Sequence, residues 1–309
     1  MTERAVDVVH IGSACRDLTD DDPRGWRLGG GATYSALTTA RLGLRTGAVV
    51  GVDATAATAM ELDLLRAAGV DLVLAPLAEG PIFVNLETPA GRVQTCVATG
   101  VPLPVRGIPE AWRSAAAWSL VPVAAELDVA WLSMVPDGSL VSLGWQGLLR
   151  ELRAGQEVAR LAPAASPLVG RADLIGVSRH DLAPDTQPSS LLTYLRHGAR
   201  LVVTDGPGGG RVFERDANGD VAVRPYEAVA PDRDIDPTGA GDVFLAALVT
   251  ALVGDASAGT PGRSIREPLG FAATAASFVV EAPGLTGVPE LAAVLARLGG
   301  APAAREAQG

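Results

Sequence analysis

A run of small residues between two carboxylates is the stretch of this chain whose composition points most directly to chemistry. It spans Asp236 to Asp242 (DPTGAGD), and an unbroken apolar run continues from there to Val253. The apolar run predicts a buried helix that begins near Ala240. Small residues at a helix N-terminus let unpaired N–H groups converge on one point, and the helix dipole favours negative charge there. The stretch therefore predicts an anion site.

Asp242 is the unexpected member of this stretch, because a carboxylate beside an anion site repels a bound phosphate. The repulsion is acceptable if the carboxylate takes a proton from an incoming hydroxyl. We therefore expect phosphoryl transfer, with Asp242 as the general base and the backbone of Gly239, Ala240 and Gly241 as the anion hole. A helix start with tight packing would explain the glycines alone, but it would not explain the carboxylate that follows them.

Two further segments follow predicted strands, where a folded sheet would present them to a ligand. Asp17 lies just past the first predicted strand, Ala5 to Ile11, and open α/β sheets bind ligands beyond the carboxyl ends of their strands. The segment Thr204 to Gly210 (TDGPGGG) ends a later strand in the same way. A tight turn between strands explains its glycines as well as a ligand site does, so both interpretations stay open.

The composition predicts a soluble enzyme built around one large core. Of the 309 residues, 48% are hydrophobic and 19% are charged, which is enough apolar material for a full core. A formal net charge of −10 argues against a nucleic-acid partner. All 25 basic residues are arginine, which excludes a lysine phosphate clamp and Schiff-base chemistry.

Cysteine usage and the chain ends favour a cytoplasmic location. Cys15 and Cys96 form no CxxC motif and no disulfide framework, as expected in a reducing compartment. The start, Met1 to Arg4, has no apolar targeting segment, and no uncharged run is long enough to cross a membrane. We expect no membrane contact, and we expect residues 299–309 to form a frayed tail.

Strands, glycine loops and helices alternate in the first part of the chain. The glycine run Gly29-Gly30-Gly31 leads into a helix of small residues that ends near Leu42-Gly43. A strand over Thr46 to Val50 and a helix from Ala56 to Ala68 follow. This order predicts a doubly wound, mostly parallel sheet. The glycine run alone is weak evidence for a ligand site, because close packing of a helix on a sheet also requires glycine.

A predicted antiparallel hairpin interrupts this order. Its strands, Ile82 to Glu87 and Arg92 to Val97, flank the turn Pro89-Ala90-Gly91. Inserted hairpins of this kind commonly form a lid over a site or a contact between subunits. We expect a small β lid from about residues 13–29 and 81–99, with a homodimer through the lid as a second use of the same surface.

The parallel order resumes downstream, and residues 1–309 are expected to form one α/β domain with helices on both faces of the sheet. The segments between the later strands are predicted to be mostly helical, most clearly Ser189 to Arg196. The later strands expected are Ala117 to Val121, Leu140 to Leu143, Leu174 to Val177 and Arg200 to Thr204, with a short pair at Arg211 to Phe213 and Val221 to Val223. Helices near Arg266 to Val280 and Pro289 to Leu298 close the domain.

Two of these motifs resemble those of a known family. The stretch Asp236 to Asp242 resembles the C-terminal signature of the PfkB/ribokinase family of carbohydrate kinases, and the Gly29-Gly30 loop resembles its N-terminal signature. The resemblance covers nearly the whole chain, because the first strand with its Asp, the hairpin and the late glycine segment occur in family order. It implies a ribokinase-like fold, ATP and Mg²⁺, and transfer of the γ-phosphate to a hydroxyl of a sugar, nucleoside or cyclitol.

The resemblance also implies a role for each matching position. Asp242 would be the general base, and the backbone from Gly239 to Gly241 would hold the transferring phosphoryl group. Asp17 would bind the acceptor, since a carboxylate accepts from two adjacent hydroxyls, and the Gly29-Gly30 loop would line the same site. The ATP-binding positions implied are Thr204, Gly206, Gly209, Thr238, Gly239 and Gly241.

The chain departs from the family pattern at the positions tied to the acceptor and the metal. Tyr34 stands where the family has Asn, which marks a divergent subgroup and disfavours simple ribose or fructose as acceptor. The family's Asn-x-x-Glu motif, tied to Mg²⁺, is replaced by Ser178-Arg179-His180-Asp181. Asp181 would then hold the metal through water; a polar loop after a strand explains the segment nearly as well.

A third departure lies at Gly144 to Arg150, which replaces an acidic and amide-bearing segment of many relatives. Arg150 is a candidate contact for the transferred phosphate, although an arginine on an ordinary helix surface is a simpler interpretation. Trp145 and Gln146 are candidate substrate contacts. Tyr34 and Trp145 would suit a ring-bearing nucleoside or the flat face of a cyclitol, so the acceptor stays open.

Two other classes of protein compete with a kinase. A non-catalytic ligand-binding or regulatory protein on a kinase-like fold is favoured by the altered segment at 178–181 and disfavoured by Asp242. A nicotinamide-linked dehydrogenase would require G-x-G-x-x-G directly after the first strand, where this chain has Gly12 and Asp17 instead. The three histidines have no metal-ligand spacing.

Overall fold

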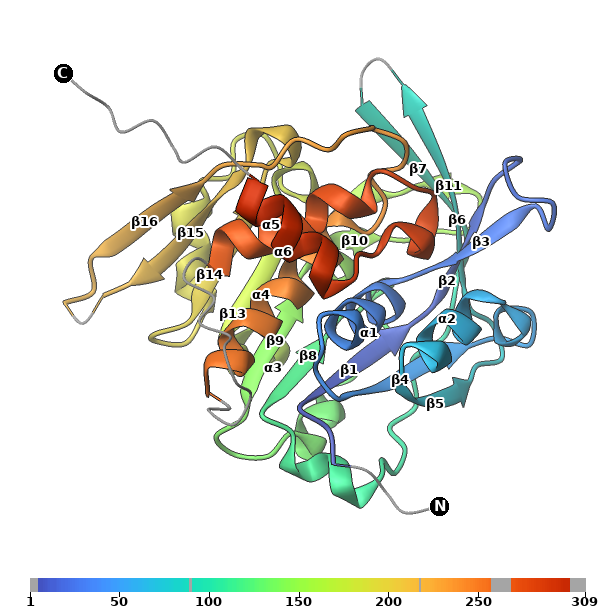
Figure 1. Ribbon diagram of the computed structural model, residues 1–309, viewed down its shortest axis with the longest axis horizontal. Coiled ribbons are helices and arrows are strands. Elements are labelled where there is room, and N and C mark those ends of the chain that lie inside the picture. Colours follow the sequence, from blue (N-terminus) through green and yellow to red (C-terminus); the bar gives the residue numbers. More distant parts are fainter. Residues whose placement is uncertain (1–4, 89–90, 217, 257–267, 301–309) are drawn as a thin grey trace.

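A nine-stranded sheet forms the centre of the computed structural model, which describes residues 5–88, 91–216, 218–256 and 268–300 (Figure 1). Across the sheet the strands are β16 (Val221–Tyr226), β15 (Gly210–Arg215), β14 (Arg200–Thr204), β13 (Leu174–Ser178), β9 (Leu140–Gly144), β8 (Ala117–Leu120), β1 (Val8–Ser13), β4 (Thr46–Val52) and β5 (Asp71–Pro76). All pairs from β14 to β5 are parallel, and β15 and β16 add an antiparallel edge. The parallel strands thus present their carboxyl ends at one edge, where such sheets bind ligands.

One face of this sheet is covered by regular helices (Figure 1). They are α1 (Gly31–Arg41), α2 (Glu61–Ala67), α4 (Ala240–Ala256), α5 (Pro268–Val279) and α6 (Leu291–Gly300). Helix α4 packs between α1 and α5. It begins at Ala240, as predicted, and its apolar side chains are buried around its whole circumference, which is why its sequence has no polar face.

The opposite face of the central sheet has few regular helices, and four buried tryptophan side chains pack against it instead. Trp112, Trp118, Trp131 and Trp145 are each exposed by 1% or less, and they share one core cluster with α3 (Pro167–Arg171). The other segments here are the 3₁₀ helices η2 (Glu110–Ser114), η3 (Val129–Met134), η4 (Gln146–Leu149) and η6 (Pro188–Tyr194). The helix expected over Ser189 to Arg196 is thus a 3₁₀ segment, and bulky indole rings supply the burial that longer helices would have given.

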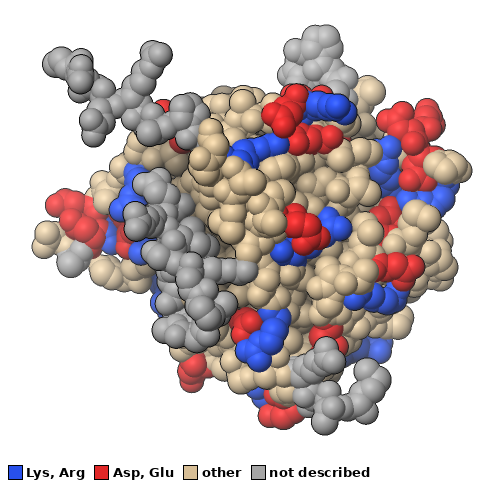
Figure 2. Space-filling model, viewed as in Figure 1, with Lys and Arg blue, Asp and Glu red and all other residues tan. Residues whose placement is uncertain are grey.

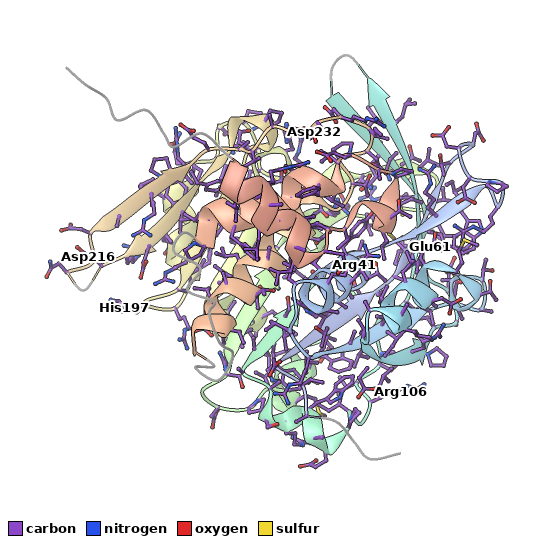
Figure 3. The ribbon with its side chains drawn as sticks, viewed as in Figure 1. Arg41, Glu61, Arg106, His197, Asp216 and Asp232 are labelled. Atoms are coloured by element: carbon purple, nitrogen blue, oxygen red, sulfur yellow. The ribbon has the colours of Figure 1, made fainter. Side chains whose placement is uncertain are left out.

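The predicted helix from Ala56 to Ala68 is also broken into two parts. A 3₁₀ turn, η1 (Ala56–Thr58), is followed by α2, and Ala59 between them is extended. The break lets Glu61, labelled in Figure 3, reach Arg24 at 2.6 Å and the backbone N–H of Leu28 at 3.2 Å. The remaining 3₁₀ turns are η5 (Arg179–Asp181), η7 (Gly206–Gly208) and η8 (Gly284–Gly287).

A second sheet of five strands stands beside the carboxyl edge of the first (Figure 1). In order its strands are β11 (Gln156–Glu157), β7 (Gly91–Thr99), β6 (Pro81–Thr88), β2 (Cys15–Leu18) and β3 (Trp26–Gly29). We call this five-stranded sheet the lid sheet. Strands β6 and β7 form the predicted hairpin, although residues 89–90 of its turn lie outside the described residues. A further two-stranded ladder joins β10 (Arg150–Glu151) to β12 (Ala159–Arg160).

Ion pairs connect the lid sheet and α1 to the rest of the molecule. Arg16 of β2 pairs with Asp53 at 3.1 Å. Arg41, labelled in Figure 3, pairs with Glu290 at 3.1 Å and donates to the backbone carbonyl of Val288, which ties α1 to the segment before α6.

Figure 2 shows acidic and arginine side chains interspersed over the visible face. Within the described ranges, no helix combines the length and the apolarity needed to cross a membrane.

Candidate active site

Asp242 lies in the first turn of α4, and its carboxylate faces the start of α1. A Cβ atom at Gly31 would lie 2.9 Å from Oδ1 of Asp242, so only glycine leaves room for the carboxylate there. Gly31, the third residue of the glycine run, therefore adjoins the predicted base. This contact was not predicted, although Gly31 belongs to a run that had been singled out.

The electrostatic surroundings suit Asp242 to proton transfer near neutral pH. Loss of hydration raises the pKa of Asp242 to about 6; Arg150 acts in the lowering direction and Asp181 in the raising direction. A carboxylate with a pKa close to the working pH is a stronger base than an ordinary aspartate and is still ionised at pH 7. The pKa thus gives physical support to the role predicted for this residue.

The turn before α4 is open on one side, and within it the N–H of Ala240 donates to the carbonyl oxygen of Pro237 at 3.3 Å. Gly239 has a φ of 81°, and a Cβ atom at Gly241 would meet nothing within 4 Å, so the turn opens toward free space. Asp236 holds the turn by accepting from the N–H of Thr238 at 3.0 Å and from the N–H of Gly284 at 3.2 Å. The side chain of Asp236 thus fixes the loop whose N–H groups would face a phosphate.

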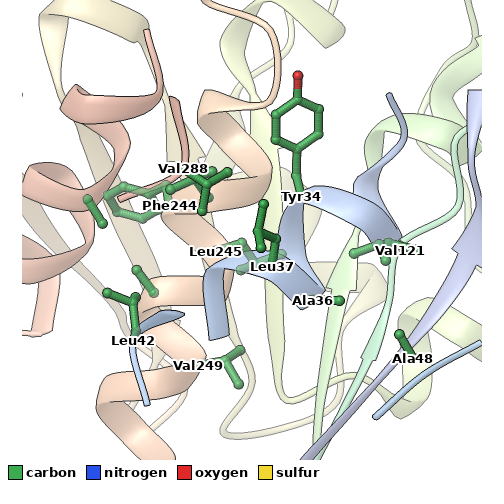
Figure 4. Packing of buried hydrophobic residues seen from close by; sticks show 14 of the residues in the cluster. Tyr34, Ala36, Leu37, Leu42, Ala48, Val121, Phe244, Leu245, Val249 and Val288 are labelled. Carbon is green, nitrogen blue, oxygen red and sulfur yellow. The ribbon is translucent and has the colours of Figure 1, made fainter. Parts of the chain in front are cut away.

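Tyr34 supports this turn from beneath. Its side chain is 2% exposed, and a Cβ atom at Gly239 would lie 2.4 Å from Cε1 of its ring. Figure 4 shows Tyr34 on α1, with its ring pointing away from Phe244 and Leu245 of α4. Tyr34, which we expect to stand in place of the family's Asn, therefore packs against the predicted anion hole, and its ring does not lie open as a platform for an acceptor.

Asp17 sits on β2 of the lid sheet and is held by its neighbours. Asn85 donates to Oδ1 of Asp17 at 3.0 Å, and the thiol of Cys15 approaches Oδ2 at 3.8 Å. A Cβ atom at Gly29 would lie 2.4 Å from Oδ2, so Gly29 is required for this position of the carboxylate. Burial raises the pKa of Cys15, which keeps it a neutral thiol.

Gly30 joins the lid sheet to α1 at a point of close approach. Its φ is 105°, and a Cβ atom there would lie 2.5 Å from the carbonyl oxygen of Ser13. A Cβ atom at each glycine of this run would meet a different neighbour. The neighbour is Asp17 at Gly29, the end of β1 at Gly30, and Asp242 at Gly31.

Arg150 lies in the middle of the acidic groups, and not on a helix surface. It belongs to β10, is largely buried, and has its guanidinium 5.9 Å from the ring centroid of Phe83. Burial lowers its pKa, and the carboxylates of Asp181, Asp242 and Asp17 oppose that shift. A delocalised cation among carboxylates is suited to hold a phosphate between them.

Gln146 and Asp181, predicted separately, touch each other. Gln146 donates to Oδ1 of Asp181 at 3.2 Å, while the buried Oδ2 of Asp181 has no hydrogen-bond partner. An unpartnered buried carboxylate oxygen fits a hydrated Mg²⁺ better than a purely structural aspartate. In the part of the chain that the structure describes, no group of three metal-binding side chains forms a closed cation cage. Trp145 is 1% exposed and faces the core.

The predicted nucleotide segment lies at the same edge of the sheet, at the end of β14. Thr204 ends this strand, and Gly206 has a φ of 50° with nothing within 4 Å of a Cβ atom there, which leaves space for a ligand. Gly209 differs, because a Cβ atom would lie 2.2 Å from the carbonyl oxygen of Tyr226. Packing against β16 is therefore sufficient to explain the glycine at 209.

The sequence did not reveal several residues that shape the site. Glu126 is buried and accepts from the backbone N–H groups of Ser13 at 2.8 Å and Ala124 at 2.8 Å, which fixes the loop after β8 against the end of β1. Asn85 and Gln94 on the lid sheet are hydrogen-bonded to each other at 2.7 Å. In the sequence, only the alternation of side chains along the two predicted hairpin strands could have indicated that Asn85 and Gln94 face the same side of the hairpin.

Comparisons with known proteins bear on the family and the fold of this chain. Residues 155–291 match the family described as pfkB family carbohydrate kinase. A comparison with curated proteins gives no match. Among solved structures, the nucleoside kinase of Methanocaldococcus jannaschii, an archaeal member of the ribokinase family, is similar with 17% identity and a TM-score of 0.65, over 96% of this chain and 99% of the other.

Two other solved structures resemble the chain over most of its length. One is the ribokinase of Arabidopsis thaliana complexed with ribose and ATP, with 21% identity, a TM-score of 0.66, and coverage of 95% of this chain and 99% of the other. The second is a pyrophosphate-dependent kinase in the ribokinase family, complexed with a pyrophosphate analogue and myo-inositol, with 18% identity, a TM-score of 0.68, and coverage of 94% and 99%.

The fold class predicted from the sequence is thereby confirmed: this is a ribokinase-like α/β protein with a mostly parallel sheet between helical layers. The match to the pfkB family of carbohydrate kinases covers residues 155–291, a part of the chain that includes the turn from Gly239 to Gly241 and Asp242.

Proposed function

We propose that this chain is an ATP-dependent kinase that transfers the γ-phosphate to a hydroxyl of a sugar or cyclitol, with Asp242 as the general base. The observation that carries the proposal is a carboxylate with a raised pKa of about 6 at the N-terminus of α4, next to an open glycine turn. A ligand-binding protein without catalysis would gain nothing from such a base. The proposal therefore favours a kinase over the regulatory alternative.

In the proposed reaction, the acceptor oxygen forms a bond to the γ-phosphorus as the bond from that phosphorus to the β–γ bridging oxygen breaks. Asp242 takes the proton of the acceptor hydroxyl, and ADP leaves with the bridging oxygen. Asp17 orients the acceptor by accepting from neighbouring hydroxyls. The N–H groups from Gly239 to Gly241 stabilise the charge on the transferring group.

The general base supplies only part of the rate enhancement. General-base catalysis contributes about 10²–10⁴-fold, roughly 3–5 kcal/mol, whereas enzymes lower barriers by roughly 8–23 kcal/mol. The remainder comes from in-line positioning and from charge stabilisation by the anion hole and Arg150. Mg²⁺ bound with the nucleotide would neutralise charge on the phosphates, and the unpartnered oxygen of Asp181 would be the group placed to hold its hydration shell.

The aromatic residues favour a sugar or cyclitol acceptor over a nucleoside. Every Phe, Trp and Tyr of the chain lies within the described ranges. Nine of them are exposed by 5% or less: Trp112, Trp118, Trp131, Trp145, Tyr34, Phe83, Phe213, Phe244 and Phe271. The others are engaged elsewhere, as with Tyr226 stacked on Phe244 and Trp26 beneath the guanidinium of Arg24. No ring is left beside Asp17 and Asp242 to stack on a base.

An acceptor panel with two phosphate donors tests the proposal. Pentoses, hexoses, inositols and nucleosides are incubated with the enzyme, Mg²⁺ and either ATP or pyrophosphate, and the phosphorylated product is detected by mass spectrometry. We expect product from ATP and at least one sugar or cyclitol. Pyrophosphate is included because one structural relative uses it. Product from nucleosides alone would contradict the acceptor class, and no product from any pair would contradict the kinase proposal.

The pH dependence of the reaction is expected to respond to Arg150. Arg150 lowers the pKa of Asp242, so an Arg150→Met variant should have a higher pKa at the base. Because the base acts only when ionised, the acid limb of the kcat/KM profile should move to higher pH. The matched control is Arg153→Met, which removes an exposed arginine that pairs with Glu151. An unmoved acid limb in Arg150→Met would show that Arg150 is not coupled to the base.

A further inference from the structure

We infer that two amides of the lid sheet, Asn85 and Gln94, are positioning residues that fix the acceptor-binding carboxylate of Asp17. The inference rests on the proposed kinase function. Gln94 donates through Nε2 to Oδ1 of Asn85 at 2.7 Å, and Asn85 donates through Nδ2 to Oδ1 of Asp17 at 3.0 Å. The three side chains form one directed relay, which ends on the carboxylate that would bind acceptor hydroxyls.

The direction of the relay follows from the chemistry of the amide group. The Asn85 amide has one oxygen that accepts and one NH₂ group that donates. Since Gln94 donates to the oxygen of Asn85, the NH₂ group is turned toward Asp17. If the Asn85 amide rotated by half a turn, its oxygen would face the Asp17 carboxylate, and two acceptors would repel each other. Gln94, at the oxygen, and Asp17, at the NH₂ group, therefore hold Asn85 in the same orientation.

The relay lies within a single sheet. Asn85 and Gln94 are directly paired across β6 and β7, and Asp17 on β2 is in register with Phe83 on β6. Asp242, in contrast, belongs to α4 on the central sheet. The acceptor-binding carboxylate and its two supporting amides are thus carried by one element, and the base by another. The relay therefore makes the placement of the acceptor relative to the base depend on the lid sheet.

A purely structural role for the two amides makes a different prediction from a positioning role. If they only stabilise the hairpin, Gln94→Glu should be milder than Gln94→Met, since glutamate is isosteric and polar. If Gln94 orients Asn85, the order reverses. Glutamate has no proton to donate, so its carboxylate would compete with Asp17 for the one NH₂ group of Asn85 and weaken the bond to Asp17. Methionine leaves Asn85 free to keep its bond to Asp17.

The test compares kinetics with the acceptor that the wild type uses. We expect Asn85→Leu to raise the acceptor KM about 10–100-fold, a loss in the range of a hydrogen bond to a charged group. Gln94→Glu should raise it more than Gln94→Met does. The KM for ATP and ATP hydrolysis without acceptor should not change. The matched control is Gln156→Ala, which removes an exposed amide from β11 of the same sheet.

A double variant shows whether the two amides act in series. Because Gln94 acts through Asn85, Asn85→Leu/Gln94→Met should have the same acceptor KM as Asn85→Leu alone. Additive effects, or a milder Gln94→Glu than Gln94→Met, would overturn the inference while leaving the kinase proposal intact. Urea unfolding of the wild type, Asn85→Leu, Gln94→Met and the double variant gives a readout without turnover. The shift of the unfolding midpoint in the double variant should differ from the sum of the shifts in the two single variants. If no acceptor is phosphorylated, the kinase proposal fails, and additive midpoint shifts would then overturn the relay as well.

Discussion

Asp242→Asn is expected to lower kcat by about 10²–10⁴-fold, because it removes the group that we propose accepts the proton of the acceptor hydroxyl. Asparagine has nearly the same shape, so the anion hole and ATP binding should be retained. The measurement is a steady-state assay with the acceptor identified by the panel, together with ATP binding by calorimetry. Near-normal turnover would contradict the assignment of the base. Asp63→Asn, at an exposed carboxylate on α2, is the matched control.

The same substitution should stabilise the fold at neutral pH. The pKa of Asp242 is about 6 in the folded chain, above its ordinary value of 3.8, so the folded state binds this proton more tightly than the unfolded state does. The carboxylate therefore costs stability that grows as pH rises from about 4 to above 6, reaching roughly 3 kcal/mol. Asn carries no such cost. The unfolding midpoint of Asp242→Asn should exceed that of the wild type at pH 7.5, and the difference should shrink near pH 4.

If Asp242→Asn gained stability and lost activity, the carboxylate of Asp242 would serve activity although it destabilises the fold, as is common in active sites. A variant that loses both would instead indicate that the carboxylate is a structural partner of its neighbours. The sign of the stability change thus separates the two roles, and it can be measured before any acceptor is known.

Local signals in the sequence predicted the part of the candidate site that lies at the start of α4. The order of small residues, carboxylate and apolar run determined where α4 starts, because a helix N-terminus and its cap are decided by a few adjacent residues. The apolar strands were also recognisable, since parallel strands are buried on both faces. Asp242 and the turn from Gly239 to Gly241 therefore lie where the sequence predicted.

Contacts between segments that are far apart in the sequence could not be predicted from local patterns. Arg150 was a candidate contact for the transferred phosphate, with an arginine on a helix surface as the simpler interpretation, and the fold places it on a two-residue strand among carboxylates. Its neighbours are far away in the sequence. The 3₁₀ segments on the tryptophan face were also missed, because the burial that decides them depends on which bulky rings meet in the folded core.

The relay from Gln94 to Asp17 is an intermediate case. A two-residue turn at 89–90 would pair Asn85 with Gln94, and these two residues are paired in the structure. The three-residue turn predicted at 89–91 does not determine which residues of the two strands face each other. A tighter turn assignment would have brought the two amides together. It would not have added Asp17, because the pairing of β2 with β6 joins segments that no local pattern connects.

Gly239→Ala is the second substitution for which we expect a large effect, since it combines backbone strain with a steric clash. Gly239 has a φ of 81°, which favours glycine, and an alanine Cβ would lie 2.4 Å from Cε1 of Tyr34. Tyr34 is held in the core and has little room to retreat. The turn must therefore shift, which moves the N–H groups that face the phosphoryl group.

The expected loss for Gly239→Ala is about 10²–10³-fold in kcat, as for the removal of an oxyanion donor, with a loss of stability of roughly 1–3 kcal/mol from the strained backbone. Two alanine variants of the same region serve as controls. Gly241→Ala meets no atom within 4 Å and should unfold like the wild type, while Gly254→Ala, later in α4, also meets none and should stabilise the helix by about 0.5–1 kcal/mol. Urea unfolding of the three variants, together with turnover of Gly239→Ala and Gly254→Ala, separates the clash from the general effect of adding a methyl group. If Gly239→Ala retained both activity and stability, the ring of Tyr34 would not be what holds the anion hole in place.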